Sequence, residues 1–260
     1  MKKLFMLLAV LIVCTSANAQ DELYLVFEMM KVDNSQESDY NETEEFWEKI
    51  HQQRANNGDI IGWDLWRLMP GGEDQGYQYA TVTLFSSKVA MFKGGNLWAN
   101  AKAAYPNMTE DQIDEKISDA ADTRDLAVRV YMEQIARTND DFNMAVGMMV
   151  TFDWMKVDIN NYTAYEKMEK EIFQPMHQKE VDDGAKGSWG LVRFVSPIGS
   201  ATYASHMTVN MFKDVDHMFA PYDSGVKLTA AQEKAISDGL KTRDMKMSNM
   251  AVLERMVRKQ

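Results

Sequence analysis

Three histidines are the residues of this sequence best suited to proton transfer, because imidazole gains and loses a proton near neutral pH. His51, His177 and His206 are therefore the candidate catalytic groups. His51 and His177 each follow a bulky aromatic residue by four positions, a spacing that places two side chains on one face of a helix. A structural role is equally open, in which each ring stacks on that aromatic residue and stabilises the negative end of the helix.

A second group of residues combines charged, hydroxyl and aromatic side chains, as small-molecule pockets do. Alternation along the expected strands puts them on one face of a sheet, opposite an apolar face that carries Val82 and Leu84. We expect the apolar face to meet the helices and the polar face to line an internal cavity. The candidate ligand-binding residues are Glu28, Trp63, Arg67, Tyr79, Asp153, Trp189, Arg193 and His206.

Structural roles compete with ligand binding at several of these positions. Arg67 and Glu28 could form an ion pair between strands without any ligand. Trp63 and Trp189 could anchor the core instead of supporting a bound molecule.

The chain contains an internal duplication, the first feature to look for in a sequence of this length. Residues 27–33 (FEMMKVD) match residues 152–158 (FDWMKVD), and similar pairs recur in the same order along both parts. The recurring pairs include His51 with His177, Trp63 with Trp189, Arg67 with Arg193, and Thr123-Arg124-Asp125 with Thr242-Arg243-Asp244. We therefore expect two repeats, residues 20–139 and 140–260.

The two repeats differ where Tyr79 in the first corresponds to His206 in the second. This divergence suggests that one half became specialised. It favours the second half, with His177 and His206 as its titratable groups.

Each repeat has the pattern of a β-α-β-β-α-β unit, an α+β arrangement of the ferredoxin-like type. In the first repeat we expect strands over 24–32, 60–69, 77–85 and 128–135, and a first helix over 42–54. Thr109 with Gln112 and Thr229 with Gln232 have capping-box spacing, as has Thr163 with Glu166. Pro175 should kink or end the first helix of the second repeat.

The segments FEMMKVD (27–33), WEKIHQQRANNG (47–58) and IIGWDLWRL (60–68), followed by a hairpin, resemble the dimeric α/β-barrel superfamily. That superfamily includes cofactor-free monooxygenases, EthD-like proteins and NIPSNAP-like proteins. The resemblance implies that the two repeats pair their sheets into one barrel with helices outside, related by a pseudo-two-fold axis. It implies no cofactor, although some relatives bind haem.

Three functional readings follow. The first is a binding protein that holds a small apolar or aromatic molecule in a cavity between the repeats. The second is a cofactor-free monooxygenase-like or isomerase-like enzyme, or a haem-binding relative, that uses the same cavity. The third is a structural protein with a filled barrel. Binding leads because no acid–base pair stands in a recognisable setting.

Residues 1–19 have the pattern of a bacterial signal peptide: Lys2 and Lys3, an apolar run, then Ala17-Asn18-Ala19 before the expected cleavage. We expect an exported, periplasmic or secreted protein that is a monomer or homodimer. Cys14 is the only cysteine, so the mature chain has no thiolate ligand for a metal. The net charge of −11, less Lys2 and Lys3, becomes −13 and argues against nucleic acid and anionic membranes as partners.

Overall fold

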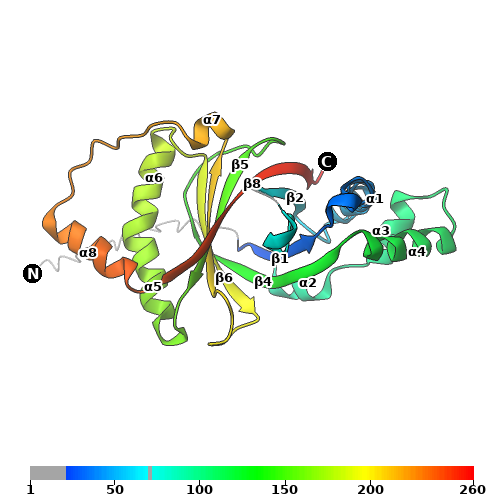
Figure 1. Ribbon diagram of the computed structural model, residues 1–260, viewed down its shortest axis with the longest axis horizontal. Helices are drawn as coiled ribbons and strands as arrows, with labels where there is room; N and C mark the ends of the chain where they lie inside the picture. Colours follow the sequence, from blue (N-terminus) through cyan, green and yellow to red (C-terminus); the bar gives the residue numbers. More distant parts are fainter. Residues whose placement is uncertain (1–21, 70–71) are drawn as a thin grey trace, which may run out of the picture.

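The computed structural model describes residues 22–69 and 72–260 (Figure 1). The expected signal peptide, its cleavage site and Cys14 lie outside the described residues. In the described part, no helix combines the length and the apolar character needed to cross a membrane.

The first half consists of strands β1–β4 and helices α1–α4. Its elements are β1 (Tyr24–Lys31), α1 (Glu37–Asn56), β2 (Gly62–Met69), β3 (Tyr79–Phe85), α2 (Lys88–Lys93), α3 (Leu97–Ala104), α4 (Glu110–Asp119) and β4 (Asp125–Arg137). Short 3₁₀ turns lie at Asn34–Gln36, Glu73–Gln75 and Ala120–Thr123.

The second half repeats this order. Its elements are β5 (Met149–Lys156), α5 (Tyr162–Met168), a π-helical turn (Glu169–Phe173), α6 (Gln174–Asp182), β6 (Ser188–Ser196), β7 (His206–Phe212), α7 (Val215–Met218), α8 (Ala230–Leu240) and β8 (Asp244–Arg258). A 3₁₀ turn at Ile159–Asn161 precedes α5.

The strands form one closed antiparallel barrel in the order β1-β3-β2-β8-β5-β7-β6-β4. Within each half the order is that of a ferredoxin-like sheet. The halves join where β8 pairs with β2 and β4 pairs with β6. The expected α+β fold, two β-α-β-β-α-β units that share one barrel, is confirmed. The barrel lies between two helical layers, α1–α4 on one side and α5–α8 on the other (Figure 1).

Apolar side chains line the barrel interior and meet across it, and cavities of about 240 and 410 Å³ lie among them, one toward each end of the barrel. Phe27 and Phe152 meet edge to face across it, with ring centroids 5.1 Å apart, and Trp66 packs on Phe152 at 5.8 Å. Val82 and Leu84 point into this same core. An eight-stranded barrel is wide enough for its own side chains or for one small ligand.

The expectation that the polar sheet face lines the barrel interior is therefore wrong. Trp63, Leu65 and Tyr79 lie on the opposite, outer face and pack with the helices. The inner face of the sheet is shielded from water when the barrel closes, so the apolar side chains lie on that face. The helices cover the outer face less completely, which leaves room there for charged and hydroxyl groups.

Of the predicted capping boxes two are confirmed and one is wrong. The capping boxes of Thr109 and Thr229 are both present. The expected box at Thr163 is absent, because α5 already begins at Tyr162. Pro175 occupies the first turn of α6, directly after the π-helical turn, so the expected interruption of this helix takes the form of a change in helical winding.

Candidate functional site

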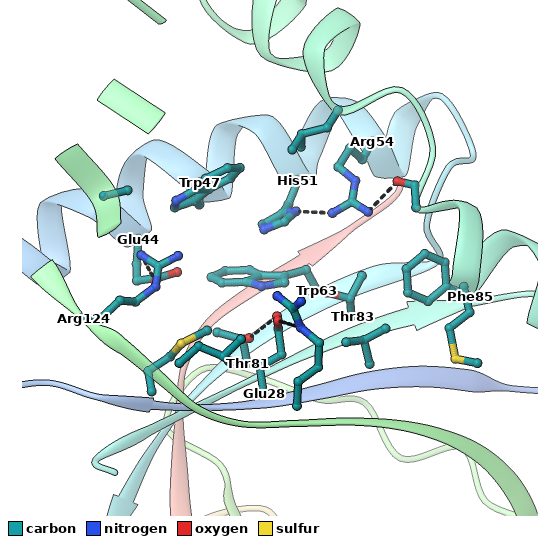
Figure 2. A pocket seen from close by; sticks show the side chains of 18 of the residues that line it. Glu28, Glu44, Trp47, His51, Arg54, Trp63, Thr81, Thr83, Phe85 and Arg124 are labelled. Atoms are coloured by element: carbon teal, nitrogen blue, oxygen red, sulfur yellow. Dashed lines mark hydrogen bonds and ion pairs between the residues drawn. The ribbon is translucent and has the colours of Figure 1, made fainter. Parts of the chain in front are cut away.

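A cavity of about 580 Å³ lies in the first half, between α1 and the outer face of the sheet (Figure 2). From α1 it is lined by Glu44, Trp47, His51 and Arg54. Their spacing of three or four residues places all four on the helix face that looks onto the sheet. The opposite wall consists of Glu28, Trp63, Thr81, Thr83 and Phe85 from the strands.

His51 is held in one orientation by aromatic stacking and by Arg54. Its ring lies on the indole of Trp63, with centroids 4.8 Å apart and planes inclined by 22°. Arg54 Nη1 donates to His51 Nδ1 at 2.9 Å. Because a guanidinium can only donate, Nδ1 must accept, and the proton of the neutral ring is on Nε2. Burial, together with the charges of Arg54 and Arg124, holds the pKa of His51 well below its usual value.

Arg54 is a buried cation, only 7% exposed. Besides His51 it reaches one acceptor, the carbonyl oxygen of Gly94, which Nη2 contacts at 2.9 Å. Its Nε is buried and has no hydrogen-bond partner among the described residues. Burial lowers the pKa of Arg54, although Asp59 and Glu28 oppose this from a distance.

Two acid–arginine pairs complete the polar lining. Arg129 Nε donates to Glu28 Oε1 at 2.6 Å, and the hydroxyl of Thr81 donates to the other carboxylate oxygen at 3.3 Å. Arg124 Nη1 lies 3.1 Å from Glu44 Oε1. Glu44 is 1% exposed, and burial raises its pKa despite the charge of Arg124.

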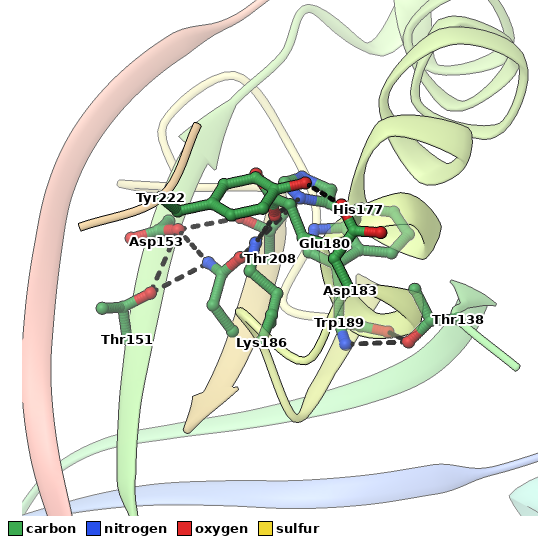
Figure 3. A network of polar contacts seen from close by, with 11 residues as sticks. Thr138, Thr151, Asp153, His177, Glu180, Asp183, Lys186, Trp189, Thr208 and Tyr222 are labelled. Atoms are coloured by element: carbon green, nitrogen blue, oxygen red, sulfur yellow. Dashed lines mark hydrogen bonds and ion pairs between the residues drawn. The ribbon is translucent and has the colours of Figure 1, made fainter. Parts of the chain in front are cut away.

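The equivalent space in the second half is occupied by a lysine (Figure 3). Lys186 Nζ lies 2.6 Å from Glu180 Oε2 and 2.8 Å from His177 Nδ1, both on α6. It also donates to Asn210 Oδ1 on β7 at 2.8 Å. The lysine therefore bridges helix and sheet. As in the first half, the histidine stacks on a tryptophan, here Trp189, with centroids 5.0 Å apart.

Asp153 of the second half belongs to the same polar network. It accepts hydrogen bonds from Thr208 at 3.2 Å and from Asn210 at 2.8 Å. These contacts satisfy the carboxylate within the protein and account for its position on the outer face without a ligand.

The structure brings together only part of the predicted site. Among the candidates, His51, Glu28 and Trp63 line the first-half cavity. Arg67 lies outside it and binds Glu254 through Nε at 2.5 Å. Tyr79 packs on the ring of Tyr40, with centroids 4.6 Å apart.

Arg193 and His206 meet at Glu166, away from this cavity. Arg193 binds Glu133 and Glu166, and Nε2 of His206 lies 3.2 Å from Glu166 Oε1. Burial lowers the pKa of His206, which Glu166 only partly offsets. The preference for the second half as the specialised one therefore conflicts with the geometry, because its groups satisfy one another.

A histidine can ligate haem iron only through a ring nitrogen whose lone pair is available. His206 does not fit, since Ser205 contacts Nδ1 at 3.0 Å and Glu166 contacts Nε2. His177 does not fit either, because Lys186 fills the space beside it. His51 borders an open cavity, but its Nδ1 accepts from Arg54 and its Nε2 carries the proton, so this ring offers no lone pair to an iron and a haem does not fit here either. No cluster of three potential metal-ligating His, Cys, Asp or Glu residues occurs within residues 22–69 and 72–260.

Sequence reasoning missed Trp47, Arg54, Glu44 and Arg124 as lining residues. The helical spacing of the α1 residues was the signal that could have identified three of them, since it places them beside His51. Strand alternation carries no information about the residues on the helix side of the site.

Solved structures with the same fold cover nearly all of this chain, whereas no protein-family model and no curated protein matches it. A "putative monooxygenase" from Lactobacillus acidophilus aligns with a TM-score of 0.57 at 8% identity, over 92% of this chain and 97% of that one. An anthrone oxidase-like protein gives 0.57 at 8%, over 92% and 94%. A "Putative Chlorite dismutase", TA0507, gives 0.51 at 10%, over 90% and 95%. The chain thus has the dimeric α/β-barrel fold, with both halves in one polypeptide.

Proposed function

We propose that this chain is an exported protein that binds a small apolar or aromatic molecule in the first-half cavity. The observation that carries this proposal is the contrast between the halves. The same histidine–tryptophan wall borders an open space of about 580 Å³ in the first half and a lysine bridge in the second. A volume in this range, bordered by aromatic and a few polar groups, suits one small organic molecule.

The cavity proposed here lies outside the barrel, whereas the sequence predicted one between the repeats. The barrel interior does contain cavities lined from both halves, of about 240 and 410 Å³, so the alternative of a structural protein with a filled barrel is not supported. Trp63 and Trp189 do not fill the interior, because both lie on the outer face with the helices. Ligand binding therefore remains the better-supported reading.

A cofactor-free monooxygenase or isomerase would need a general base beside the substrate. His51 is poorly suited to that task, because its Nδ1 accepts from Arg54 and its Nε2 carries the proton. Glu28 is paired with Arg129. A ring in this tautomer can donate a hydrogen bond from Nε2 to a bound molecule, which supports binding over catalysis.

Native mass spectrometry of the protein purified from its own source tests this proposal. We expect a co-purifying organic molecule of a few hundred daltons that is lost from the Trp63→Leu variant and kept by Trp189→Leu. An absorption spectrum of the same sample distinguishes haem by its Soret band. Protein that carries no molecule and binds no aromatic probe would contradict the proposal.

A further inference from the structure

Besides Arg124 Nη1, which forms an ion pair with Glu44, two hydrogen-bond donors of the cavity wall have no partner within the part of the chain that the structure describes. Arg54 Nε and Trp47 Nε1 are both buried and unsatisfied among the described residues, and both residues line the cavity. A buried polar group without a partner costs free energy, so such groups are rare unless something else binds them. Two donors on one cavity wall indicate a bound molecule that presents acceptor atoms.

The second half provides an internal reference for these donors. The residues at the positions of Trp47 and Arg54 are Phe173 and Glu180 there. Phe173 has no donor, and Glu180 has a counter-charge in Lys186 at 2.6 Å. The charge at this position is therefore reversed between the halves. The acid in the second half has a built-in cation, whereas no described carboxylate pairs with the arginine in the first half.

The other charges of the cavity do not neutralise Arg54. Arg129 is paired with Glu28, and Arg124 with Glu44. The lining therefore holds three cations against two carboxylates, and Asp59, outside the lining, acts on Arg54 through its charge without forming an ion pair with it. An anion is the group that such a buried, unpaired guanidinium binds most favourably.

Resting on the proposed function, we infer that the ligand of the first-half cavity is an aromatic anion whose carboxylate, or comparably acidic oxygen, binds Arg54. The ring system of the ligand packs near Trp63 and Phe85. Trp47 Nε1 donates a second hydrogen bond to an oxygen of the same ligand.

A structural role for Arg54 is the competing explanation. The residue belongs to the last turn of α1, where a cation interacts favourably with the helix dipole, and it ties α1 to Gly94. That role accounts for Nη1 and Nη2 but leaves Nε without a partner. It also predicts no preference of the cavity for negatively charged ligands.

Two probes that differ in charge separate these explanations. 2-Naphthoate and 2-naphthamide share one planar skeleton, and only the first is an anion. In calorimetric titrations we expect the wild-type protein to bind 2-naphthoate at least about tenfold more tightly than 2-naphthamide. A charge-assisted hydrogen bond contributes free energy of that order. This comparison requires no variant and is insensitive to effects of mutation on folding.

Variants then assign the preference to one residue. Arg54→Gln should remove the preference for 2-naphthoate while it keeps the affinity for 2-naphthamide within about twofold. Arg54→Lys should restore part of it, and Arg67→Gln, outside the cavity, should leave it unchanged. Equal affinity of the wild type for both probes, or a preference that survives Arg54→Gln, would overturn this inference alone. If neither probe binds, the proposed function fails and this inference fails with it.

Discussion

Ile60 and Lys186 occupy the same backbone position in the two halves. The amide of Ile60 donates to the carbonyl of Arg54 at 3.4 Å, and the amide of Lys186 donates to that of Glu180 at 3.2 Å. One half therefore places an apolar side chain, and the other an ammonium, at the same point beside the histidine–tryptophan stack. We attribute the open cavity of the first half and the bridged site of the second to this exchange.

Transplanting the second-half contacts should close the first-half cavity. The triple variant Arg54→Glu, Ile60→Lys and Thr83→Asn recreates the contacts of Glu180, Lys186 and Asn210 at the equivalent positions. We expect calorimetric titration to show at least about a tenfold loss of affinity for 2-naphthamide, because a lysine side chain would fill its space. Because 2-naphthamide is uncharged, the change of charge in Arg54→Glu should have little direct effect on its affinity.

The single variant Ile60→Lys is the control for the transplant. It places an ammonium beside Arg54 without a carboxylate, and should lower the free energy of unfolding by several kcal/mol, on the order of 3–5. The triple variant should recover much of that loss in urea titrations. A triple variant as unstable as the single one, or one that still binds the probe, would show that the two sites are not equivalent.

Removal of the lysine from the second half should destabilise the protein. Lys186→Met keeps the aliphatic part of the side chain but leaves Glu180 and Asn210 without their donor. We expect a loss of about 1–3 kcal/mol in the free energy of unfolding. The double variant Lys186→Met with Glu180→Gln removes both charges and should be more stable than the single variant. The opposite order would contradict the assignment of the bridge as an ion pair.

Mild acid should weaken the fold through its buried histidines. Burial lowers the pKa of His51, His177 and His206. Below about pH 6.5 the unfolded chain takes up protons that the folded chain does not, so the free energy of unfolding falls with pH. The slope should reach at most about 1.4 kcal/mol per pH unit for each histidine, until the pH falls to its pKa in the folded state.

His51→Gln isolates one contribution to this pH dependence. Chemical unfolding at pH 7.5, 6.5 and 5.5 should give a shallower slope for the variant than for the wild type. An identical slope would mean that His51 is protonated in the folded protein, contrary to its acceptance of a hydrogen bond from Arg54.

The two stacked tryptophans should respond alike in stability and differently in binding. Trp63 is 2% and Trp189 1% exposed, so replacement of either by leucine should cost a few kcal/mol, roughly 2–4, in the free energy of unfolding. Only Trp63→Leu should weaken the binding of 2-naphthoate, by about tenfold. Equal effects of both replacements on calorimetric affinity would mean that the probe responds to general stability.

The fold was predictable because two kinds of sequence signal agree. The residue pairs that recur in both repeats show the duplication, and the alternation of apolar residues shows the strands. The expected stacking of His51 on the aromatic residue four positions earlier is confirmed at Trp47, with centroids 5.9 Å apart, whereas the stacks of His51 on Trp63 and of His177 on Trp189 were not predicted. Which sheet face turns inward could not be read from β3, since both of its faces can be buried in a barrel covered by helices. The apolar character of Val82 fits a barrel interior as well as it fits a helix contact.

Single residue differences between the two halves determine where the cavity lies. The sequence pattern does not show which of these differences matters. Tyr79 against His206 stood out because both residues are polar, yet both are satisfied by neighbours. The difference between Ile60 and Lys186 carries no signal in the sequence, because a lysine near the end of a helix is usually solvated. Only the fold shows that Lys186 is 8% exposed and extends toward β7.

A crystal structure of the protein with 2-naphthoate would locate the ligand itself. We expect electron density for the ring between α1 and β1–β3, against Trp63, with the carboxylate at Arg54. We expect no probe beside Trp189, where Lys186 should keep its contacts with Glu180 and Asn210. Density for the probe beside Trp189 or inside the barrel, with the first-half cavity empty, would show that the ligand site lies elsewhere.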